Sequence, residues 1–326
     1  MNDISKVNIF ITHTPLQNFI AAKIATQFYG TKEYKNVLYS SVSVEDTSVF
    51  DDYMFINKGR FFKKILSTYL VKRKIERLIK YNKTRVFISH TAALLDNYFF
   101  YSFPLQRYNA DINLFYEGIL YFYEYRQKID TKEHSRRKIY GRLCNMQYQP
   151  KSIILPVEDN RVKQIFSILP EFTLGPIDKI RKVSILKNSY ACNENTILIM
   201  GGKPSLLENI EVISIYSEMI KKIKSFDRPL KIYFKGHHAD TSDNFKIANK
   251  EQIEVEDISQ NSPIEEVIEI YKPSLVLSYP SSGLINLKAM YGGEINMISY
   301  YIEKKKDQIE YLNPVFESLE IQLKVI

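Results

Sequence analysis

The stretch Lys231–Asp240 reads KIYFKGHHAD and contains two of the five histidines in the chain. Its β-branched and aromatic residues predict a short buried strand over Lys231–Phe234. Lys235, Gly236 and the two histidines follow this strand directly. Ligands of open α/β sheets bind beyond the carboxyl ends of the strands, so this stretch is a candidate site for an anionic ligand. A turn that carries two surface histidines is the alternative interpretation.

The composition is that of a globular protein, because 45% of the 326 residues are hydrophobic and 25% are charged. This length is sufficient for two domains, each with its own core. The net charge of +8 suits an anionic substrate, an anionic membrane surface or nucleic acid. Cys144 and Cys192 form neither a metal-binding motif nor a disulfide framework, which predicts a reducing, cytoplasmic location. The N-terminus lacks the pattern of a signal peptide, and no apolar run reaches membrane-spanning length.

Apolar runs of strand length alternate with helical runs along the chain. The expected strands are Val7–Thr12, Asn36–Val44, Thr84–Ile88, Asp111–Tyr116, Ser152–Pro156, Thr196–Met200, Lys231–Phe234, Ile253–Asp257 and Ser274–Ser278. The expected helices are one that begins at Pro15, then Phe61–Lys83, Val162–Leu169, Leu206–Lys224, Glu265–Tyr271 and Leu284–Tyr291. A break in this pattern between about 172 and 196 is the best candidate for a linker. We therefore expect two doubly wound, Rossmann-like α/β domains, 1–175 and 190–326, that face a central cleft.

Two strand ends in the first half carry a histidine between hydroxyl residues. His13 follows the first strand, where Thr14 can cap a helix and Gln17, three residues on, can close a capping box. Such a helix terminus also binds anions or hydroxyl groups. The strand Thr84–Ile88 ends similarly, in Ser89, His90 and Thr91. The repetition suggests a polar cleft lined from both sides, although helix capping alone would give the same pattern.

Glu117 directly follows the strand Asp111–Tyr116 and precedes Gly118. A carboxylate at a strand end is well placed to act as a general base, and the glycine leaves room for a substrate. Several aromatic residues follow within a few positions. Such residues are common around sugar rings, and they are equally common where tyrosines pack on a helix.

Two further polar points follow strands in the second half. Gly201 and Gly202 come after Thr196–Met200 and suit a loop that approaches a phosphate or a sugar, but they match neither a Walker loop nor a dinucleotide fingerprint. Ser281 and Ser282 precede the helix Leu284–Tyr291. Two hydroxyls beside free backbone N–H groups can hold a phosphate, or they can simply cap the helix.

The run Phe61–Lys83 predicts an amphipathic helix or helix pair whose polar face is mostly Lys and Arg. A solvated surface helix is one interpretation, and attachment to anionic lipid headgroups is the other. The polar, basic run Arg126–Arg142 is interpreted as a mobile loop or an exposed helix.

Three of these motifs, in this order, resemble those of the bacterial sialyltransferases. The similarity is closest to glycosyltransferase family 52, with related motifs in families 38 and 80. Tyr116-Glu117-Gly118 matches the acidic-acidic-Gly motif of the family, with Tyr116 in the first acidic position. Lys235-Gly236-His237-His238 matches its Lys-Gly-His-Pro-like motif, with His238 in place of proline. Ser281-Ser282 matches the serine motif, and the opening NIFITHTPLQ is similar to the first strand and turn of the family.

The resemblance implies a GT-B fold and an inverting, metal-independent transfer of sialic acid. The donor would be CMP-sialic acid, and the acceptor a hydroxyl of a cell-surface glycan of the lipooligosaccharide or capsule type. Glu117 would be the base and His237 the partner of the leaving phosphate. The expected donor-binding residues are Gly201, Gly202, Lys235, Gly236, Ser281 and Ser282, and the expected acceptor-binding residues are His13, Thr14, Gln17 and His90.

No Asp-x-Asp motif occurs in the chain, which fits a site without a divalent metal ion, and no cofactor is expected. The expected partners are the donor, the glycan acceptor and the anionic inner face of the cell membrane, but not nucleic acid, while a homodimer is left open. Two alternatives remain. One is a hexosyltransferase of the same fold with another nucleotide sugar, and the other is a non-catalytic nucleotide- or glycan-binding protein.

Overall fold

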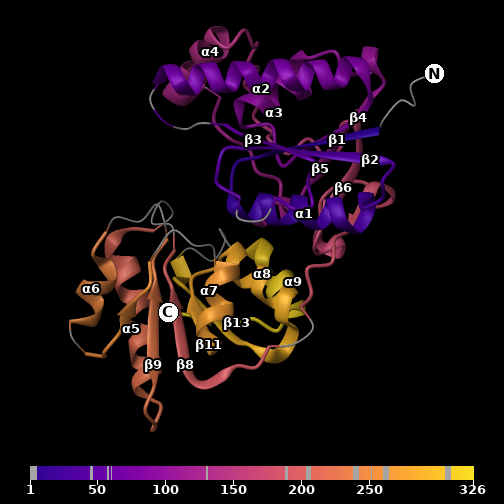
Figure 1. Cartoon of the computed structure of the whole chain (residues 1–326). Helices are drawn as coiled ribbons and strands as arrows, with labels where there is room; N and C mark the ends of the chain where they lie inside the picture. Colours follow the sequence, from indigo (N-terminus) through magenta and orange to yellow (C-terminus); the bar gives the residue numbers. More distant parts are fainter. Residues whose placement is uncertain are drawn as a thin grey trace. The chain divides into compact units, whose positions relative to one another are not determined.

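The computed structural model describes residues 6–44, 47–56, 59, 61–129, 131–187, 190–202, 207–237, 242–250, 252–259, 264–304 and 310–326. His238 lies outside these residues. The chain divides into two compact units, Met1–Ser184 and Ile185–Ile326. Each unit is a parallel sheet with helices packed against it (Figure 1).

The N-terminal unit contains, in its described residues, a seven-stranded sheet with the order β3-β2-β1-β4-β5-β6-β7. Its strands are β1 (Lys6–Thr12), β2 (Tyr34–Ser40), β3 (Asp52–Phe55), β4 (Lys83–Ile88), β5 (Ala110–Phe115), β6 (Val162–Ser167) and β7 (Ile180–Lys182). All neighbouring strands are parallel. The strand order reverses at β1, which has β2 on one side and β4 on the other, and this is the point where doubly wound folds bind ligands.

Helices cover both faces of this sheet. The main helices are α1 (Pro15–Tyr29), α2 (Phe61–Tyr81), α3 (Leu94–Asn97), which continues as a π-helix over Tyr98–Ser102, and α4 (Lys132–Leu143). In Figure 1, α1 lies on one face, and α2 and α4 lie on the other. The central strands are buried almost throughout, which is the reason that apolar residues are frequent on both of their faces.

A cluster of aromatic rings lies between α1 and the strands that this helix covers. The rings of Phe10 and Phe87 are stacked with centroids 4.4 Å apart, and Phe166 lies 5.6 Å from Phe87. Tyr29, at the end of α1, contacts Phe87 edge-on at 5.7 Å. Because aromatic pairs stabilise by up to about 1.5 kcal/mol beyond their buried area, this cluster fixes α1 against β1, β4 and β6.

The C-terminal unit repeats the same topology with six described strands in the order β10-β9-β8-β11-β12-β13. These strands are β8 (Asn193–Met200), β9 (Lys231–Lys235), β10 (Glu256–Asp257), β11 (Pro273–Ser278), β12 (Asn296–Tyr301) and β13 (Gln322–Val325). Its helices are α5 (Asn209–Lys224), α6 (Asn244–Asn249), α7 (Ile264–Tyr271), α8 (Ser282–Tyr291) and α9 (Asn313–Ser318). The strand order reverses between β8 and β11, so the switch point lies at the ends of these two strands.

The core of this unit forms between α5 and the sheet. Val212, Ile215, Tyr216, Met219, Ile220 and Ile223 recur at helical spacing and are all buried. They pack against Ile197 and Ile199 of β8 and Leu275 and Leu277 of β11.

Two predicted elements were wrong. Val162–Leu169 was expected as a helix, but β6 forms there instead. A run this short does not distinguish the period of a helix from that of a strand. Its hydrogen-bonded pairing with β5 and β7 makes it a strand. Ser152–Pro156 was expected as a strand, but Ile153 forms only an isolated antiparallel bridge with Arg126. Pro156 has no backbone N–H to continue a ladder.

Other boundaries differ from the prediction. The strand expected over Asn36–Val44 ends at Ser40. Strand β3 lies between the second strand and α2, where no strand was expected, and β7 lies within the expected linker. The strand expected over Ile253–Asp257 is only two residues long. These are edge strands or strand ends, where fewer buried residues mark the element.

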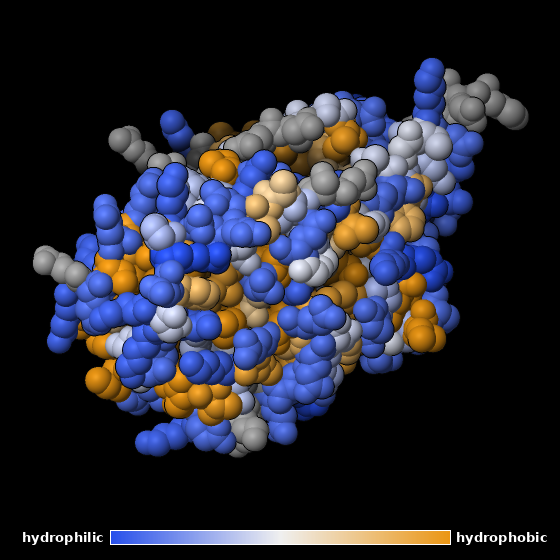
Figure 2. Space-filling view, turned by 90° about the horizontal axis from the view of Figure 1, so that it is seen from below, coloured by the Kyte–Doolittle hydropathy of each residue, from blue (hydrophilic) through white to orange (hydrophobic). Residues whose placement is uncertain are grey.

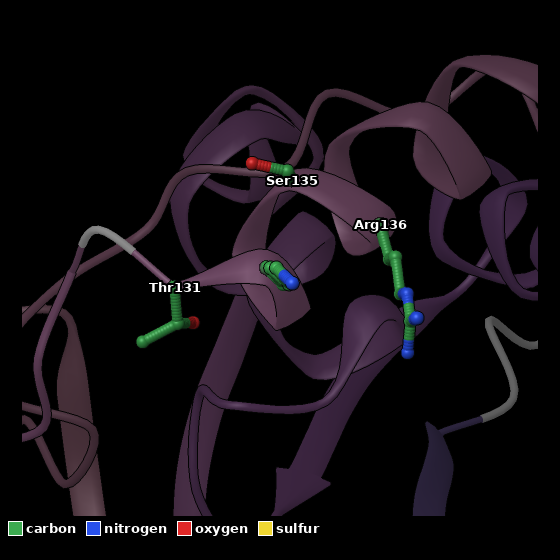
Figure 3. Close-up of a pocket in the computed structure, with 4 residues that line it drawn as sticks. Thr131, Ser135 and Arg136 are labelled. Atoms are coloured by element: carbon green, nitrogen blue, oxygen red, sulfur yellow. The ribbon is translucent and has the colours of Figure 1, made fainter.

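Within the basic run Phe61–Lys83, residues Phe61–Tyr81 form one helix, α2, and Lys83 begins β4. Its polar face is not uniformly solvated, because Lys72 is buried and pairs with Glu76. The run Arg126–Arg142 contains α4, which begins where Thr131 Oγ1 accepts a hydrogen bond from the His134 N–H at 3.3 Å. A pocket of about 480 Å³ lies at this helix start and is lined by Thr131, Lys132, Ser135 and Arg136 (Figure 3).

The surface face in Figure 2 is mainly hydrophilic, with hydrophobic residues scattered among the hydrophilic ones. None of the helices in the described ranges is both long enough and apolar enough to cross a membrane.

Candidate active site

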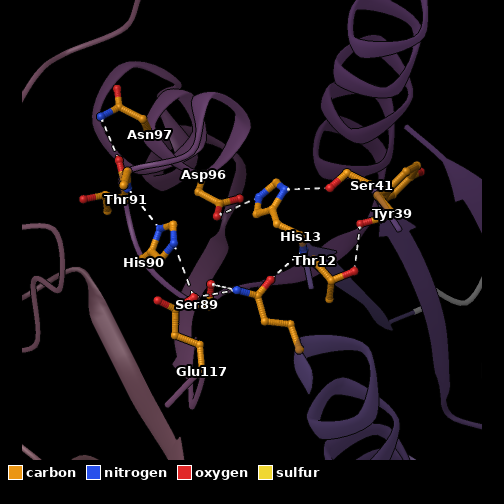
Figure 4. A network of polar contacts seen from close by, with 12 residues as sticks. Thr12, His13, Tyr39, Ser41, Ser89, His90, Thr91, Asp96, Asn97 and Glu117 are labelled. Carbon is orange, nitrogen blue, oxygen red and sulfur yellow. Dashed lines mark hydrogen bonds and ion pairs between the residues drawn. The ribbon is translucent and has the colours of Figure 1, made fainter. Parts of the chain in front are cut away.

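Polar side chains of the N-terminal unit gather at the carboxyl ends of β1, β4 and β5 (Figure 4). His13 follows β1, His90 follows β4, and Glu117 follows β5. Because neighbouring parallel strands end at the same edge of a sheet, these residues meet although they are far apart in the sequence. His90 Nε2 lies 3.3 Å from Glu117 Oε2, and both side chains are largely buried.

Gln17 connects these strand ends. Its Oε1 accepts a hydrogen bond from the His13 N–H at 2.5 Å, and its Nε2 donates to Ser89 Oγ at 2.8 Å and to Glu117 Oε2 at 2.5 Å. Thr14 Oγ1 accepts from the Gln17 N–H at 3.2 Å, so the predicted helix cap is present. The Gln17 side chain, however, does not close a capping box on Thr14, because its Oε1 accepts from the N–H of His13 rather than from that of Thr14.

The ring of His90 has a defined orientation. Its Nδ1 accepts a hydrogen bond from the Ala92 N–H at 3.1 Å. We therefore assign the proton of the neutral ring to Nε2, the atom that faces Glu117. Glu117 thus has two donors, the Gln17 amide and His90, which fix the position of its Oε2.

His13 forms a second histidine–carboxylate pair, with a residue that sequence reasoning missed. Its Nε2 lies 3.1 Å from Asp96 Oδ2, and its Nδ1 lies 3.4 Å from Ser41 Oγ. Asp96 is fully buried in α3, and its Oδ1 has no hydrogen-bond partner in the described part of the chain. No motif distinguishes Asp96, because only the packing of α3 brings it to His13.

The hydroxyl groups around the two histidines have structural roles. Thr12 Oγ1 donates to Asn18 Oδ1 at 2.5 Å, and Thr91 Oγ1 donates to the Ile154 carbonyl at 2.9 Å. Tyr121 OH donates to the Ser89 carbonyl at 2.7 Å. Burial and, to a smaller extent, the charges of Glu117 and Asp96 raise the pKa of Tyr121, so this hydroxyl remains a donor.

In the C-terminal unit, the turns after β8 and β9 lie against each other. The Gly201 N–H donates to the Lys235 carbonyl at 2.8 Å, and a Cβ on Gly201 would lie 3.0 Å from Gly236 Cα. A Cβ on Gly202 would lie only 2.3 Å from the ring of Tyr279, which follows β11. The two glycines are therefore needed for the close approach of three strand ends.

Ser281 is the N-cap residue of α8 by position, but its hydroxyl makes no capping hydrogen bond. Its Oγ is buried without a hydrogen-bond partner in the described residues. Ser282 is the first residue of α8. A buried, unsatisfied hydroxyl beside the free N–H groups of a helix start is a suitable partner for a bound anion.

Lys235 lies near Glu265, a residue that sequence reasoning did not single out. Burial lowers the pKa of Lys235, and the Glu265 charge opposes this shift. Burial also raises the pKa of Glu265, while a backbone hydrogen bond and one from Asn286 Nδ2, at 3.0 Å, oppose it. The Gly236 N–H donates to Ser259 Oγ at 2.7 Å, which holds the turn before His237 in place.

The predicted site residues therefore form two groups, each at the switch point of its own sheet. His13, Thr14, Gln17, His90 and Glu117 belong to the N-terminal unit. The donor-binding candidates and His237 belong to the C-terminal unit. Within the ranges described above, no cluster of three or more His, Cys, Asp and Glu residues could hold a metal ion.

Solved structures share this fold over the whole chain. An α/β-galactoside α-2,3-sialyltransferase from the marine bacterium Photobacterium phosphoreum is similar with a TM-score of 0.59 and 14% identity, over 99% of both chains. The UDP-GlcNAc 2-epimerase of Methanocaldococcus jannaschii is similar with a TM-score of 0.53 and 12% identity, over 98% of this chain and 88% of the epimerase chain. No protein-family model matches the chain, and no curated protein matches it. The chain has the GT-B fold, as predicted, and membership of family 52 stays a prediction.

Proposed function

We propose that this GT-B protein is an inverting, metal-independent glycosyltransferase that transfers sialic acid from CMP-sialic acid to a hydroxyl of a cell-surface glycan. The observation that carries the proposal is Glu117, a carboxylate at a strand end whose Oε2 contacts Gln17 at 2.5 Å and His90 at 3.3 Å. A carboxylate held in this way can accept a proton from an incoming hydroxyl. The motif resemblance supports sialic acid as the sugar, and lipooligosaccharide or capsule as the type of acceptor.

In the proposed reaction, the acceptor oxygen forms a bond to the anomeric carbon of the donor while its proton passes to Glu117. The bond from this carbon to the phosphate oxygen breaks, and its electron pair leaves with CMP. Gln17 and His90 hold the carboxylate for this transfer, while His13 and Thr14 would bind the acceptor. Asp96 contacts the His13 ring from a fully buried position and acts as a positioning residue.

The donor side has to stabilise the negative charge that develops on the phosphate. Ser281 supports this role because its buried hydroxyl has no described partner, and the N–H groups at the start of α8 lie beside it. Lys235 and His237 would supply cationic or N–H donors, and Ser282 a second hydroxyl. Gly201, Gly202 and Gly236 would let the backbone approach the nucleotide.

A donor screen tests the function. The protein is incubated with CMP-sialic acid or with UDP-hexoses, with and without lactose-type acceptors, and release of CMP or UDP is measured in excess chelator. We expect acceptor-dependent CMP release that the chelator does not reduce, because no Asp-x-Asp motif is present. An absolute requirement for Mg²⁺ or Mn²⁺ would contradict the metal-independent site. Release of UDP instead would identify a hexosyltransferase, and nucleotide binding without any turnover would identify a binding protein.

Replacement of the unpartnered hydroxyl tests the phosphate site. Ser281→Ala should weaken CMP binding roughly 10–100-fold, because a hydrogen bond to a charged group contributes about 1.5–3 kcal/mol. Thermal stability should be unchanged, since this hydroxyl does not cap α8. Calorimetric titration with CMP and a thermal melt measure the two effects.

Thr131→Ala is the matched control for Ser281→Ala. Thr131 does cap its helix, so its replacement should lower stability by about 1 kcal/mol and leave CMP binding intact. Unchanged CMP affinity in a folded Ser281→Ala variant would remove this serine from the phosphate site.

Peripheral attachment to the inner face of the cell membrane belongs to the same proposal, because the net charge of +8 and the basic helix α2 suit anionic lipid headgroups. A homodimer stays a prediction, and light scattering on the purified protein measures it.

A further inference from the structure

The outward face of α2 is apolar over its first half. Phe61 is 56% exposed, Phe62 82%, Leu66 58% and Leu70 46%. Phe62, Leu66 and Leu70 recur at intervals of four and therefore form one stripe along the helix. Large side chains of this kind usually face the core of a globular protein, so a stripe of them on the surface needs a reason.

A second apolar stripe lies on the neighbouring helix α4. Ile139 is 59% exposed and Leu143 is 51% exposed, again at an interval of four. The two helices are joined by a hydrogen bond of 2.8 Å between Thr68 Oγ1 and Tyr140 OH, and by Cys144 Sγ, which lies 3.7 Å from the Ile65 carbonyl. Figure 1 shows α4 beside the first half of α2. The two stripes thus belong to one side of the N-terminal unit, here called the α2–α4 surface.

Cationic residues surround these stripes. Lys63 and Lys64 are exposed on α2, while Lys132, Lys138 and Arg142 are exposed on α4. Glu76 is the acidic residue of α2, and it is buried against Lys72. Glu133 is the acidic residue of α4, and it pairs with Arg137. The exposed charge of the α2–α4 surface is therefore strongly positive.

We propose that the α2–α4 surface binds a bilayer that contains anionic lipids. Phe61, Phe62, Leu66, Leu70, Ile139 and Leu143 enter the boundary between headgroups and acyl chains, and the surrounding lysines pair with lipid phosphates. Amphipathic helices with this combination of apolar and cationic residues lie in the membrane interface. Lys132 and Arg136 also line the pocket at the start of α4, beside the hydroxyls of Thr131 and Ser135, which offers further donors to a headgroup (Figure 3).

The charge distribution favours a bilayer over a second copy of the chain as the occupant. Two copies that met through this surface would bring their lysines together, and like charges at an interface oppose association. An anionic lipid surface instead attracts each lysine and buries the apolar stripes at the same time. This inference does not depend on the sugar that the protein transfers, so the donor screen and the membrane test can fail independently.

The depth of insertion can be measured with a single fluorophore, because the chain contains no tryptophan. The Phe62→Trp variant should show a blue-shifted emission with mixed phosphatidylcholine–phosphatidylglycerol vesicles, and quenching by lipids brominated on their acyl chains. Ile177 is 87% exposed in the same unit and lies in the short 3-10 helix that precedes β7, so Ile177→Trp is the matched control and should show neither change. Equal responses of the two variants, or no response in Phe62→Trp, would overturn the proposal.

The charge contribution is tested by vesicle co-sedimentation. Replacement of four lysines of the surface by Gln should lower binding to the mixed vesicles by about 100-fold or more, since each charge near the membrane contributes roughly five-fold. The replaced residues are Lys63, Lys64, Lys132 and Lys138. A control protein carries the same change at four exposed lysines elsewhere, Lys163, Lys182, Lys224 and Lys231. The control should bind like the wild type.

Each result of this assay is decisive. Failure of the wild type to sediment with mixed vesicles at low salt contradicts the proposal, as does equal binding to pure phosphatidylcholine vesicles. A Phe62→Ser, Leu66→Ser variant that turns a dimer into a monomer but keeps full vesicle binding would assign the apolar stripe to self-association instead.

Discussion

Glu117→Gln is expected to lower the rate of transfer from CMP-sialic acid by about 10²–10⁴-fold, the usual contribution of a general base. The amide has the shape of the carboxylate and can still accept the hydrogen bond that Gln17 Nε2 now donates at 2.5 Å. The fold and the position of the side chain should therefore be preserved, while the ability to accept a proton is lost. CMP affinity should be unchanged, because the proposed nucleotide contacts lie in the other unit.

Two further variants sharpen this test. Glu124 is an exposed glutamate that pairs with Arg126, so Glu124→Gln changes the same chemical group outside the site and should keep full activity. His237→Ala should reduce both CMP affinity and turnover, because its proposed partner is the leaving phosphate. Near-normal turnover of Glu117→Gln would show that the base is another residue, with His13 and His90 the next candidates. Turnover and CMP affinity of the three variants decide among these assignments.

Lys72→Met is expected to lower the free energy of unfolding of the N-terminal unit by about 3–5 kcal/mol, because it breaks a buried ion pair and leaves the Glu76 carboxylate without its buried cation. Lys72 and Glu76 side chains are only 3% and 9% exposed, and Lys72 Nζ lies 3.3 Å from Glu76 Oε1. Tyr98 OH donates to the same oxygen at 2.6 Å. A loss of this size corresponds to a fall in melting temperature of roughly 10 °C for a unit of this length.

The exposed neighbour Arg73 provides the control for this prediction. Its side chain is 60% exposed, and its Nη1 lies 3.7 Å from Glu76 Oε2. Arg73→Met should therefore change the free energy of unfolding by less than about 1 kcal/mol. Adding Glu76→Leu to Lys72→Met should recover much of the lost stability, since an apolar pair can replace a buried ion pair at little cost. Urea unfolding curves measure all three variants. Equal stability of Lys72→Met and wild type would mean that Glu76 is satisfied without Lys72.

The repeated strand–helix pattern predicted two doubly wound α/β domains, and the motif resemblance then predicted the GT-B fold. The α/β pattern was predictable because parallel strands covered on both faces are rich in apolar residues, as in β1 and in the second half of β8. It also placed His13, His90 and Glu117 directly after strands. The strand order β1-β4-β5 brings these three strand ends to one edge of the sheet, where the residues meet.

Other features depend on packing between segments that are distant in the sequence, and these became visible only in the folded chain. β6 is a strand because β5 and β7 lie on either side of it, and the mixed sequence of residues 162–169 suited a helix equally well. Lys72 is buried because the rings of Tyr69 and Tyr98 and the carboxylate of Glu76 surround it, although its neighbours in the sequence predicted a solvated face.

The same holds for the finer structure of the candidate site. Gln17 matched a local capping motif, but its side chain contacts Glu117, which is 100 residues away in the sequence. Asp96 showed no motif, and it pairs with His13 only because α3 packs against the end of β1. Local patterns record which backbone conformations and which degree of burial a segment favours. A polar side chain pairs with the group that the completed fold brings within hydrogen-bond distance. A pattern of neighbouring residues in the sequence does not contain that information.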